Sequence, residues 1–119
     1  MLACHSCEQQ KCATEAAACD VAGVKCRALL DCVSQSGCGT GSQDQGIECY
    51  CGQTDIDSCV SATDPSVPQG VCKVHYEAAA GTNVPVDLTN IFSDYDSALG
   101  KSTKVIDCYQ AHCADECNL

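Results

Sequence analysis

Fourteen cysteines in 119 residues constrain this chain more than any other feature of its sequence. Cysteine makes up about 12 % of the residues, a level typical of disulfide scaffolds. The even number allows every cysteine to pair, and seven bridges at roughly 2–4 kcal/mol each would dominate the stability. Because cytosolic thiols stay reduced, this framework predicts a secreted, extracellular or cell-surface protein.

The side chains available for a core are mostly small. The sequence has no Trp, one Phe and four Tyr, so much of its apolar content is Ala and Cys. Since burial contributes roughly 25 cal/mol per Å² of apolar surface, such a core depends on covalent cross-links. The length predicts a single disulfide-rich domain over residues 1–119.

The chain is acidic, with a net charge of −10 from sixteen acidic and six basic residues. This charge argues against nucleic acid and anionic membrane surfaces as partners. No apolar run is long enough for a transmembrane segment. Residues 1–3 are too short for a signal peptide, so we expect a mature secreted sequence. A lipid anchor on Cys4 would leave thirteen cysteines, an odd number, and is not expected.

Two helices are predicted in the first third of the chain. Residues 4–19 lack Gly and Pro and are rich in Ala, Gln and Glu, and residues 25–36 end at Gly37. The short connection over residues 20–24 favours an antiparallel helical hairpin. Residues 37–70 are rich in Gly and Pro and are expected to form loops tied down by cysteines, which are Cys38, Cys49, Cys51 and Cys59.

Further helices are predicted in the second half. One is expected from about residue 69 to 80, where Val71, Val74 and Ala78 share one face. A helical turn is expected over residues 87–92 and a last helix over 97–116. The predicted fold is therefore all-α and disulfide-rich, with about four helices and a disulfide-tied loop region in the middle.

The hairpin suggests two nested bridges, Cys19–Cys26 inside and Cys12–Cys32 outside. The rise along each helix agrees, at about 10.5 Å on one side and about 9 Å on the other. The angles agree less well, because six residues place Cys32 about 120° around the helix from Cys26. The remaining cysteines have no assigned partner; Cys4, Cys7 and Cys38 are expected to bond among Cys49, Cys51, Cys59, Cys72, Cys108, Cys113 and Cys117.

Several motifs suggest chemistry, and each has a structural alternative. The C-x-x-C at Cys4 follows no strand, so a structural pair bridged to two different partners is favoured over a redox motif. Cys49-Tyr50-Cys51 is expected to send two bridges in different directions. Covalent haem needs C-x-x-C-H, which is missing here. Non-covalent haem stays open, with three candidate axial ligands: His5, His75 and His112.

Metal sites also remain open. Cys4, His5, Cys7 and Cys12 have ligand types suited to zinc, although the same sulfurs are expected in bridges. The alternating aspartates at residues 55–57 and 94–96 lack the Gly and distal Glu of an EF-hand loop and are interpreted as solvated turns. No G-x-S-x-G motif is present, and no catalytic residue is predicted.

Several segments together resemble a known group of proteins. They are the run C-x2-C-x4-C-x6-C, the stretches CRALLDCV, CYCG and GVCKVHYEAAAGT, and the C-terminal cysteines Cys108, Cys113 and Cys117. The chain thus resembles uncharacterised cysteine-rich secreted proteins and lipoproteins of myxobacterial-type deltaproteobacteria. The resemblance implies an extracellular location and carries over no activity.

The function expected is that of a non-enzymatic extracellular binding or structural module. Self-assembly at the cell surface is one form that this function could take. Its partner would be another protein or a second copy, and the loops over residues 38–70 would form the recognition surface. The alternative is a secreted metal- or haem-binding redox or electron-transfer protein.

Overall fold

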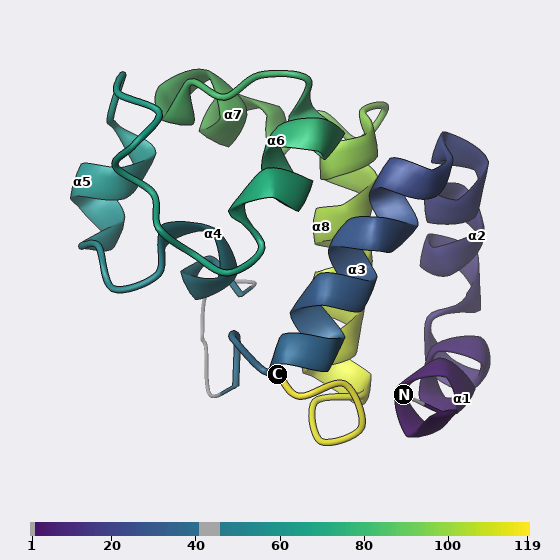
Figure 1. Ribbon diagram of the computed structural model, residues 1–119. Helices are drawn as coiled ribbons and strands as arrows, with labels where there is room; N and C mark the ends of the chain where they lie inside the picture. The colour runs from purple at the N-terminus through teal and green to yellow at the C-terminus, as the bar shows by residue number, and fades with distance from the viewer. Residues whose placement is uncertain (1, 41–45) are drawn as a thin grey trace.

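A computed structural model describes residues 2–40 and 46–119 (Figure 1). Part of the expected loop surface, residues 41–45, lies outside this described part of the chain. Over the described residues the fold is all-helical, with eight α-helices and no β-strand. The helices are α1 (Leu2–Lys11), α2 (Ala13–Ala22), α3 (Val24–Ser36), α4 (Glu48–Cys51), α5 (Ile56–Val60), α6 (Lys73–Ala80), α7 (Pro85–Ile91) and α8 (Ala98–His112).

The helix expected over residues 4–19 is two helices, α1 and α2, which separate at Cys12. The backbone of Cys12 has φ −128° and ψ 24°, outside the helical region. Its amide still donates to the carbonyl of Glu8 at 2.7 Å, so the chain bends without losing that hydrogen bond. Because no Gly or Pro marks the bend, the local sequence does not reveal it.

The predicted hairpin exists, but α2 and α3 alone form it. Gly23 ends α2 and precedes α3 with φ 102°, a conformation that favours glycine. The two helices then run in opposite directions side by side (Figure 1). The inner face of α3 repeats every three or four residues, as in an amphipathic helix, and consists of Cys26, Leu29, Leu30 and Val33.

The expected loop region contains two short helices, α4 and α5. Asp55 caps α5 by accepting a hydrogen bond from the amide of Ser58 at 3.1 Å. The chain then returns along α4, where Gly70 N donates to Tyr50 O at 2.8 Å. A Cβ on Gly70 would lie 2.2 Å from the carbonyl oxygen of Cys49, so only glycine allows this approach. Because of this contact, the next helix, α6, begins only at Lys73.

The helices of the second half also differ from the expected bounds. The buried face of α6 carries Tyr76 and Ala79, whereas Val71 and Val74 are 64 % exposed. The expected turn over 87–92 is a full helix, α7, which starts at Pro85. The last helix, α8, ends at His112 instead of continuing to residue 116.

Helix α8 lies at the centre of the molecule, against α2 and α3 (Figure 1). Its buried side chains and those of α3 belong to one connected core that also includes most of the cysteine sulfurs. The core contains few large side chains, as the composition predicted. The largest that are fully buried are Tyr50, Tyr76 and Tyr109. The core is therefore small and cross-linked.

Seven disulfides join all fourteen cysteines. Three of them form a ladder between the N-terminal and C-terminal segments, which lie at the same end of the molecule in Figure 1. The other four connect residues 19–72 to one another. The seven bridges are Cys4–Cys117, Cys7–Cys113, Cys12–Cys108, Cys19–Cys26, Cys32–Cys72, Cys38–Cys49 and Cys51–Cys59.

The expected Cys12–Cys32 bridge is wrong, whereas the Cys19–Cys26 bridge is present. Cys26 is the third residue of α3, so the helix is regular between it and Cys32. The angular offset of about 120° therefore applies in full, and the two sulfurs leave α3 in different directions. Cys26 faces α2, while Cys32 bonds to Cys72 next to α6.

Candidate functional site

An apolar pocket of about 200 Å³ opens among the helices on the side of the molecule away from α1 and α2. Every helix from α5 to α8 contributes to it, together with the residue that precedes α4 (Figure 1). The lining residues are Ile47, Ile56, Val60, Tyr76, Thr89, Phe92 and Thr103. The pocket therefore depends on how four helices and the segment before α4 are held together.

Covalent and polar links hold those elements in place. The Cys51–Cys59 bridge ties α5 to α4. Thr89 of α7 donates a hydrogen bond to the carbonyl of Val60 at 3.1 Å, which connects α7 to α5. Thr103 of α8 donates to the carbonyl of Phe92 at 3.0 Å, which connects α8 to the end of α7. The walls are thus fixed by bonds that do not depend on a ligand.

The polar groups of the pocket are already engaged. Both threonine hydroxyls donate to backbone carbonyls, as described above. The hydroxyl of Tyr76 is 3.4 Å from the carbonyl of Gly46. Among the residues that the structure describes, no charged side chain lines the pocket. Because burying an unpaired charge is costly, the lining favours a neutral, mainly apolar ligand.

Three aromatic rings lie in a row beside the pocket. The rings of Tyr50 and Tyr76 are 5.3 Å apart, and the rings of Tyr76 and Phe92 meet edge to face at 6.2 Å. Burial raises the pKa of Tyr50 to about 12 and also raises the pKa of Tyr76. These rings therefore stay neutral over the physiological pH range and act as apolar surface.

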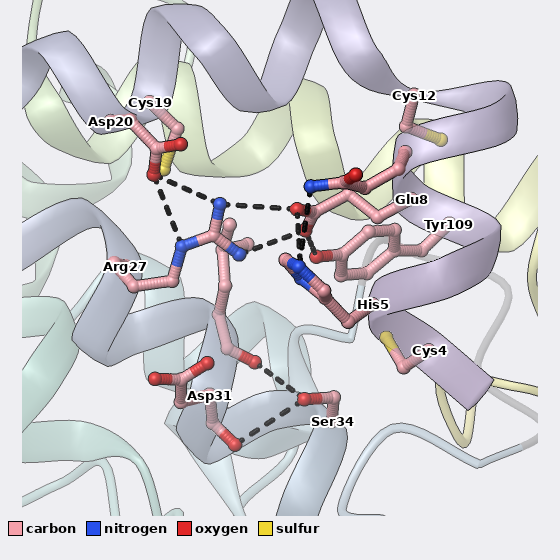
Figure 2. A network of polar contacts seen from close by, with 12 residues as sticks. Cys4, His5, Glu8, Cys12, Cys19, Asp20, Arg27, Asp31, Ser34 and Tyr109 are labelled. Carbon is pink, nitrogen blue, oxygen red and sulfur yellow. Dashed lines mark hydrogen bonds and ion pairs between the residues drawn. The ribbon is translucent and has the colours of Figure 1, made fainter. Parts of the chain in front are cut away.

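A separate polar network joins α1, α2, α3 and α8 (Figure 2). Its centre is Glu8, whose side chain is 3 % exposed and accepts two hydrogen bonds from Arg27, at 2.8 and 3.1 Å. Arg27 also donates to Asp20 at 2.9 Å, and the hydroxyl of Tyr109 donates to Glu8. All four side chains have partners, so the network serves to hold the helices together.

The charges in this network reinforce one another. The hydrogen bond to Glu8 raises the pKa of Arg27 above its already high usual value. Burial raises the pKa of Tyr109, and its hydrogen bond to Glu8 adds to the increase. Removing any one donor would leave a buried carboxylate incompletely paired, which is strongly destabilising.

The predicted site cysteines fall into structural bridges. Cys4 and Cys7 bond to two different partners, and so do Cys49 and Cys51. In both the C-x-x-C and the C-x-C motif, the two cysteines therefore form separate structural bridges, as predicted from the sequence. The candidate zinc ligands Cys4, Cys7 and Cys12 each form a disulfide with a cysteine of the C-terminal segment.

The three histidines do not meet at a common site. His5 is exposed on α1, within 3.2 Å of Gln9, and His112 is exposed at the end of α8. His75 is half-buried on α6. None of the three lines the apolar pocket. Among the described residues, the one group of three potential metal ligands contains no histidine and consists of Cys38, Cys49 and Cys72.

The two pairs of alternating aspartates differ, because residues 55–57 begin α5 whereas residues 94–96 form a turn before α8. Asp55 caps α5, and Asp94 accepts a hydrogen bond from the amide of Asp96 at 3.2 Å. Neither pair belongs to a group of three clustered ligands in the described part of the chain. The interpretation as a turn therefore agrees with the structure at residues 94–96, whereas at residues 55–57 it is wrong because Asp55 starts a helix that contains Asp57.

Neither the pocket nor the N- to C-terminal ladder is among the features predicted from the sequence. The pocket had no signal, because its residues are ordinary apolar side chains spread from Ile47 to Thr103. The ladder did have one. The spacing Cys4-x2-Cys7-x4-Cys12 read forward differs by one residue from Cys117-x3-Cys113-x4-Cys108 read backward, which is close to what two antiparallel segments require.

The fold and bridges define the class of this protein as an all-helical, disulfide-rich domain with an apolar pocket. Comparison with protein-family models, curated proteins and solved structures gives no significant match. The resemblance drawn from the cysteine spacing stays a prediction. No helix in residues 2–40 and 46–119 combines the length and apolar character needed to cross a membrane.

Proposed function

We propose that this chain is a non-enzymatic extracellular binding module whose pocket takes a small, neutral, mainly apolar molecule. The observation that carries the proposal is the preformed apolar pocket of about 200 Å³. An apolar cavity of about 150 Å³ in another protein binds benzene, so a pocket of this size suits a small aromatic or aliphatic molecule. Three of its lining residues belong to the expected recognition segment, residues 38–70, and these are Ile47, Ile56 and Val60.

The bridges support the extracellular part of the proposal. All fourteen cysteines pair, and disulfides of this density persist only where the surroundings are oxidising. The intact mass should therefore be about 14 Da below that of the fully reduced chain. A protein purified without reductant that still reacts with a thiol-labelling reagent would contradict this part of the proposal.

Binding is tested with a series of small neutral aromatics, namely benzene, toluene and indole, compared with benzoate as a charged analogue. We expect the neutral compounds to shift the NMR signals of the Ile56 and Val60 methyl groups and to raise the denaturation midpoint. Benzoate should bind much more weakly, because the described lining of the pocket contains no charged partner for its carboxylate. The absence of any shift up to the solubility limit would refute the proposal.

A matched pair of substitutions assigns the binding to the pocket. Val60→Trp fills the pocket from α5, whereas Val21→Trp makes the same change at a residue that is 84 % exposed on α2. Val60→Trp should abolish binding and Val21→Trp should leave it unchanged. Equal effects from the two variants would show that the ligand binds elsewhere, and circular dichroism verifies that both variants keep their helices.

Self-association is a second candidate function. It is favoured by two exposed apolar side chains near the start of α6: Val71, which precedes the helix, and Val74, which lies in it, are each 64 % exposed. Light scattering should then show a mass above 12.4 kDa that increases with concentration and falls in a Val74→Lys variant. A mass that stays monomeric at high concentration would rule this function out.

The alternative of a metal- or haem-binding redox protein has less support. The histidines lie away from the pocket, and the clustered sulfurs are bonded in bridges. The visible absorption spectrum of protein purified from its natural source tests this alternative, because bound haem or a metal–thiolate centre absorbs where the polypeptide does not.

A further inference from the structure

Two disulfides lie side by side between the end of α3 and the start of α6. The Sγ atom of Cys38, in the Cys38–Cys49 bridge, is 3.8 Å from the Sγ atom of Cys72, in the Cys32–Cys72 bridge. The sulfurs of Cys38, Cys49 and Cys72 all lie within 4.8 Å of one another. Elsewhere in the described residues no third sulfur approaches a bridge to form such a group.

The same two bridges contain the two most exposed cysteines of the chain. Cys32 and Cys38 are partly exposed, while the other twelve cysteines are each at most 9 % exposed. A shallow depression of about 480 Å³ leads to Cys32 and is lined by Ala28, Asp31, Cys32, Gln35, Ser36 and His75. Because access to sulfur limits thiol–disulfide exchange, an external thiol should react here first.

A hydroxyl group lies between the two bridges. Ser36 Oγ donates to Cys38 Sγ at 2.9 Å and is 4.0 Å from Cys72 Sγ. A hydroxyl donor stabilises the anionic thiolate more than the neutral thiol. Ser36 is therefore suited to hold Cys38 as a thiolate next to the sulfur of Cys72.

We propose that Cys32–Cys72 and Cys38–Cys49 form a thiol–disulfide exchange site for small external thiols, in which Cys38 changes partner from Cys49 to Cys72. This site is independent of the apolar pocket and of the function proposed for it. Its substrate class is a low-molecular-weight thiol or dithiol, which supplies the electrons.

Three successive thiolate attacks make up the exchange. An external thiolate attacks Cys38 Sγ, the Cys38–Cys49 bond breaks, and Cys49 leaves as a thiolate that is then protonated. A second thiolate attacks the mixed disulfide, which releases the external disulfide and the Cys38 thiolate. Two external thiols are thereby oxidised and one bridge is reduced. The Cys38 thiolate then attacks Cys72 Sγ, the Cys32–Cys72 bond breaks, and the Cys32 thiolate leaves with no further change in oxidation state.

The exchange would change which elements are tied together. In the oxidised chain, Cys38–Cys49 ties the end of α3 to α4. After exchange, the Cys38–Cys72 bond keeps the end of α3 next to α6, and α4 loses its covalent link to α3. The five other bridges are untouched, so the exchange acts on the middle of the fold while the N- to C-terminal ladder stays closed.

Partial reduction of the native protein tests the proposal. The chain is treated with limiting dithiothreitol, quenched in acid, alkylated and mapped by mass spectrometry. In molecules that have lost one bridge, the alkylated cysteines should come only from Cys32, Cys38, Cys49 and Cys72. About a tenth or more should carry the Cys38–Cys72 bond, because exchange between adjacent sulfurs is reversible. Loss of a different bridge first, or the absence of Cys38–Cys72, would overturn the proposal.

Two matched variants separate exchange from mere accessibility. Cys49→Ser leaves Cys38 free next to Cys72, and Cys59→Ser leaves Cys51 free and buried, outside the sulfur group. Disulfide maps of Cys49→Ser should contain both Cys32–Cys72 and Cys38–Cys72, while Cys59→Ser should keep the native Cys32–Cys72 bond. Identical maps from the two variants would argue against transfer. If a variant does not fold, the partial reduction of the native chain still decides the question.

The role of Ser36 as a positioning residue has its own readout. In Ser36→Ala the rate of Cys38–Cys72 formation should fall and its optimum should move to higher pH, because the Cys38 thiolate loses a hydrogen-bond donor. The order in which bridges are reduced should not change. An unaltered pH dependence of the rate would remove Ser36 from the proposed site.

Discussion

The three buried tyrosines differ in what their hydroxyl groups contact. Tyr109 donates to the buried carboxylate of Glu8, and Tyr76 lies 3.4 Å from the carbonyl of Gly46. The hydroxyl of Tyr50 has no hydrogen-bond partner among the described residues. Since an unpaired buried hydroxyl is unfavourable, the three positions should respond differently to loss of the oxygen.

We expect Tyr109→Phe to lower the free energy of unfolding by about 1–3 kcal/mol, because it removes a donor from a buried charge. Tyr50→Phe should change it by less than about 0.5 kcal/mol or increase it. Denaturation in guanidinium chloride measures both variants. A loss in Tyr50→Phe equal to that in Tyr109→Phe would show that the Tyr50 hydroxyl is paired.

At the scale of elements, the ladder between α1 and the C-terminal segment is the main covalent support. Its three bridges close sequence separations of 113, 106 and 96 residues. The middle bridge, Cys7–Cys113, closes a much smaller loop while its neighbours are intact. Cys7 lies five positions before Cys12 and Cys113 lies five positions after Cys108, so that loop contains about ten residues.

Removal of one ladder bridge should therefore cost less than its sequence separation suggests. We expect Cys7→Ser/Cys113→Ser to lower the free energy of unfolding by about 2–3 kcal/mol, as for a short loop, instead of nearly 5 kcal/mol. Guanidinium denaturation of the double variant gives the value. A matched control is Cys19→Ser/Cys26→Ser, which opens a loop of 7 residues and should cost a similar amount. A loss near 5 kcal/mol would mean that the three bridges act independently.

At the scale of the whole molecule, buried tyrosines make stability depend on alkaline pH. Burial raises the pKa of Tyr50 to about 12 and raises the pKa of Tyr76 and Tyr109 as well. An unfolded tyrosine titrates near pH 10, so above that pH the unfolded chain releases protons that the folded chain retains. The stabilisation is fully present below about pH 10 and is lost as the pH rises toward the folded pKa.

Three such residues should lower the free energy of unfolding by about 4 kcal/mol between pH 9 and pH 11, or about 1.4 kcal/mol each. Denaturation curves at several pH values measure this change, and tyrosinate absorbance follows the protons directly. The Tyr50→Phe variant should lose about 1.4 kcal/mol less than the native chain over the same range. Parallel behaviour of the two proteins would contradict burial as the cause.

Much of the local structure follows from the sequence alone. The helix over residues 25–36 corresponds to α3, because its apolar spacing and Gly37 define both the buried face and the end. The expected end of the third helix at residue 80 also agrees with α6. The predicted first residues of the helices were less accurate. Helix α6 begins at Lys73 because residues 69–72 contact α4, and no local pattern in the sequence reveals that contact.

By itself, the sequence determined the class of the protein: helical, acidic and held together by bridges, with Cys19–Cys26 as a local pair. These properties depend on composition and on contacts between residues close in the chain. Only the tertiary structure decided the ladder, the Cys32–Cys72 and Cys38–Cys49 pair, and the pocket. Fourteen cysteines allow about 135,000 pairings, and the choice among them depends on which helix faces meet. That depends on packing around α8, which brings together residues separated by up to 113 positions.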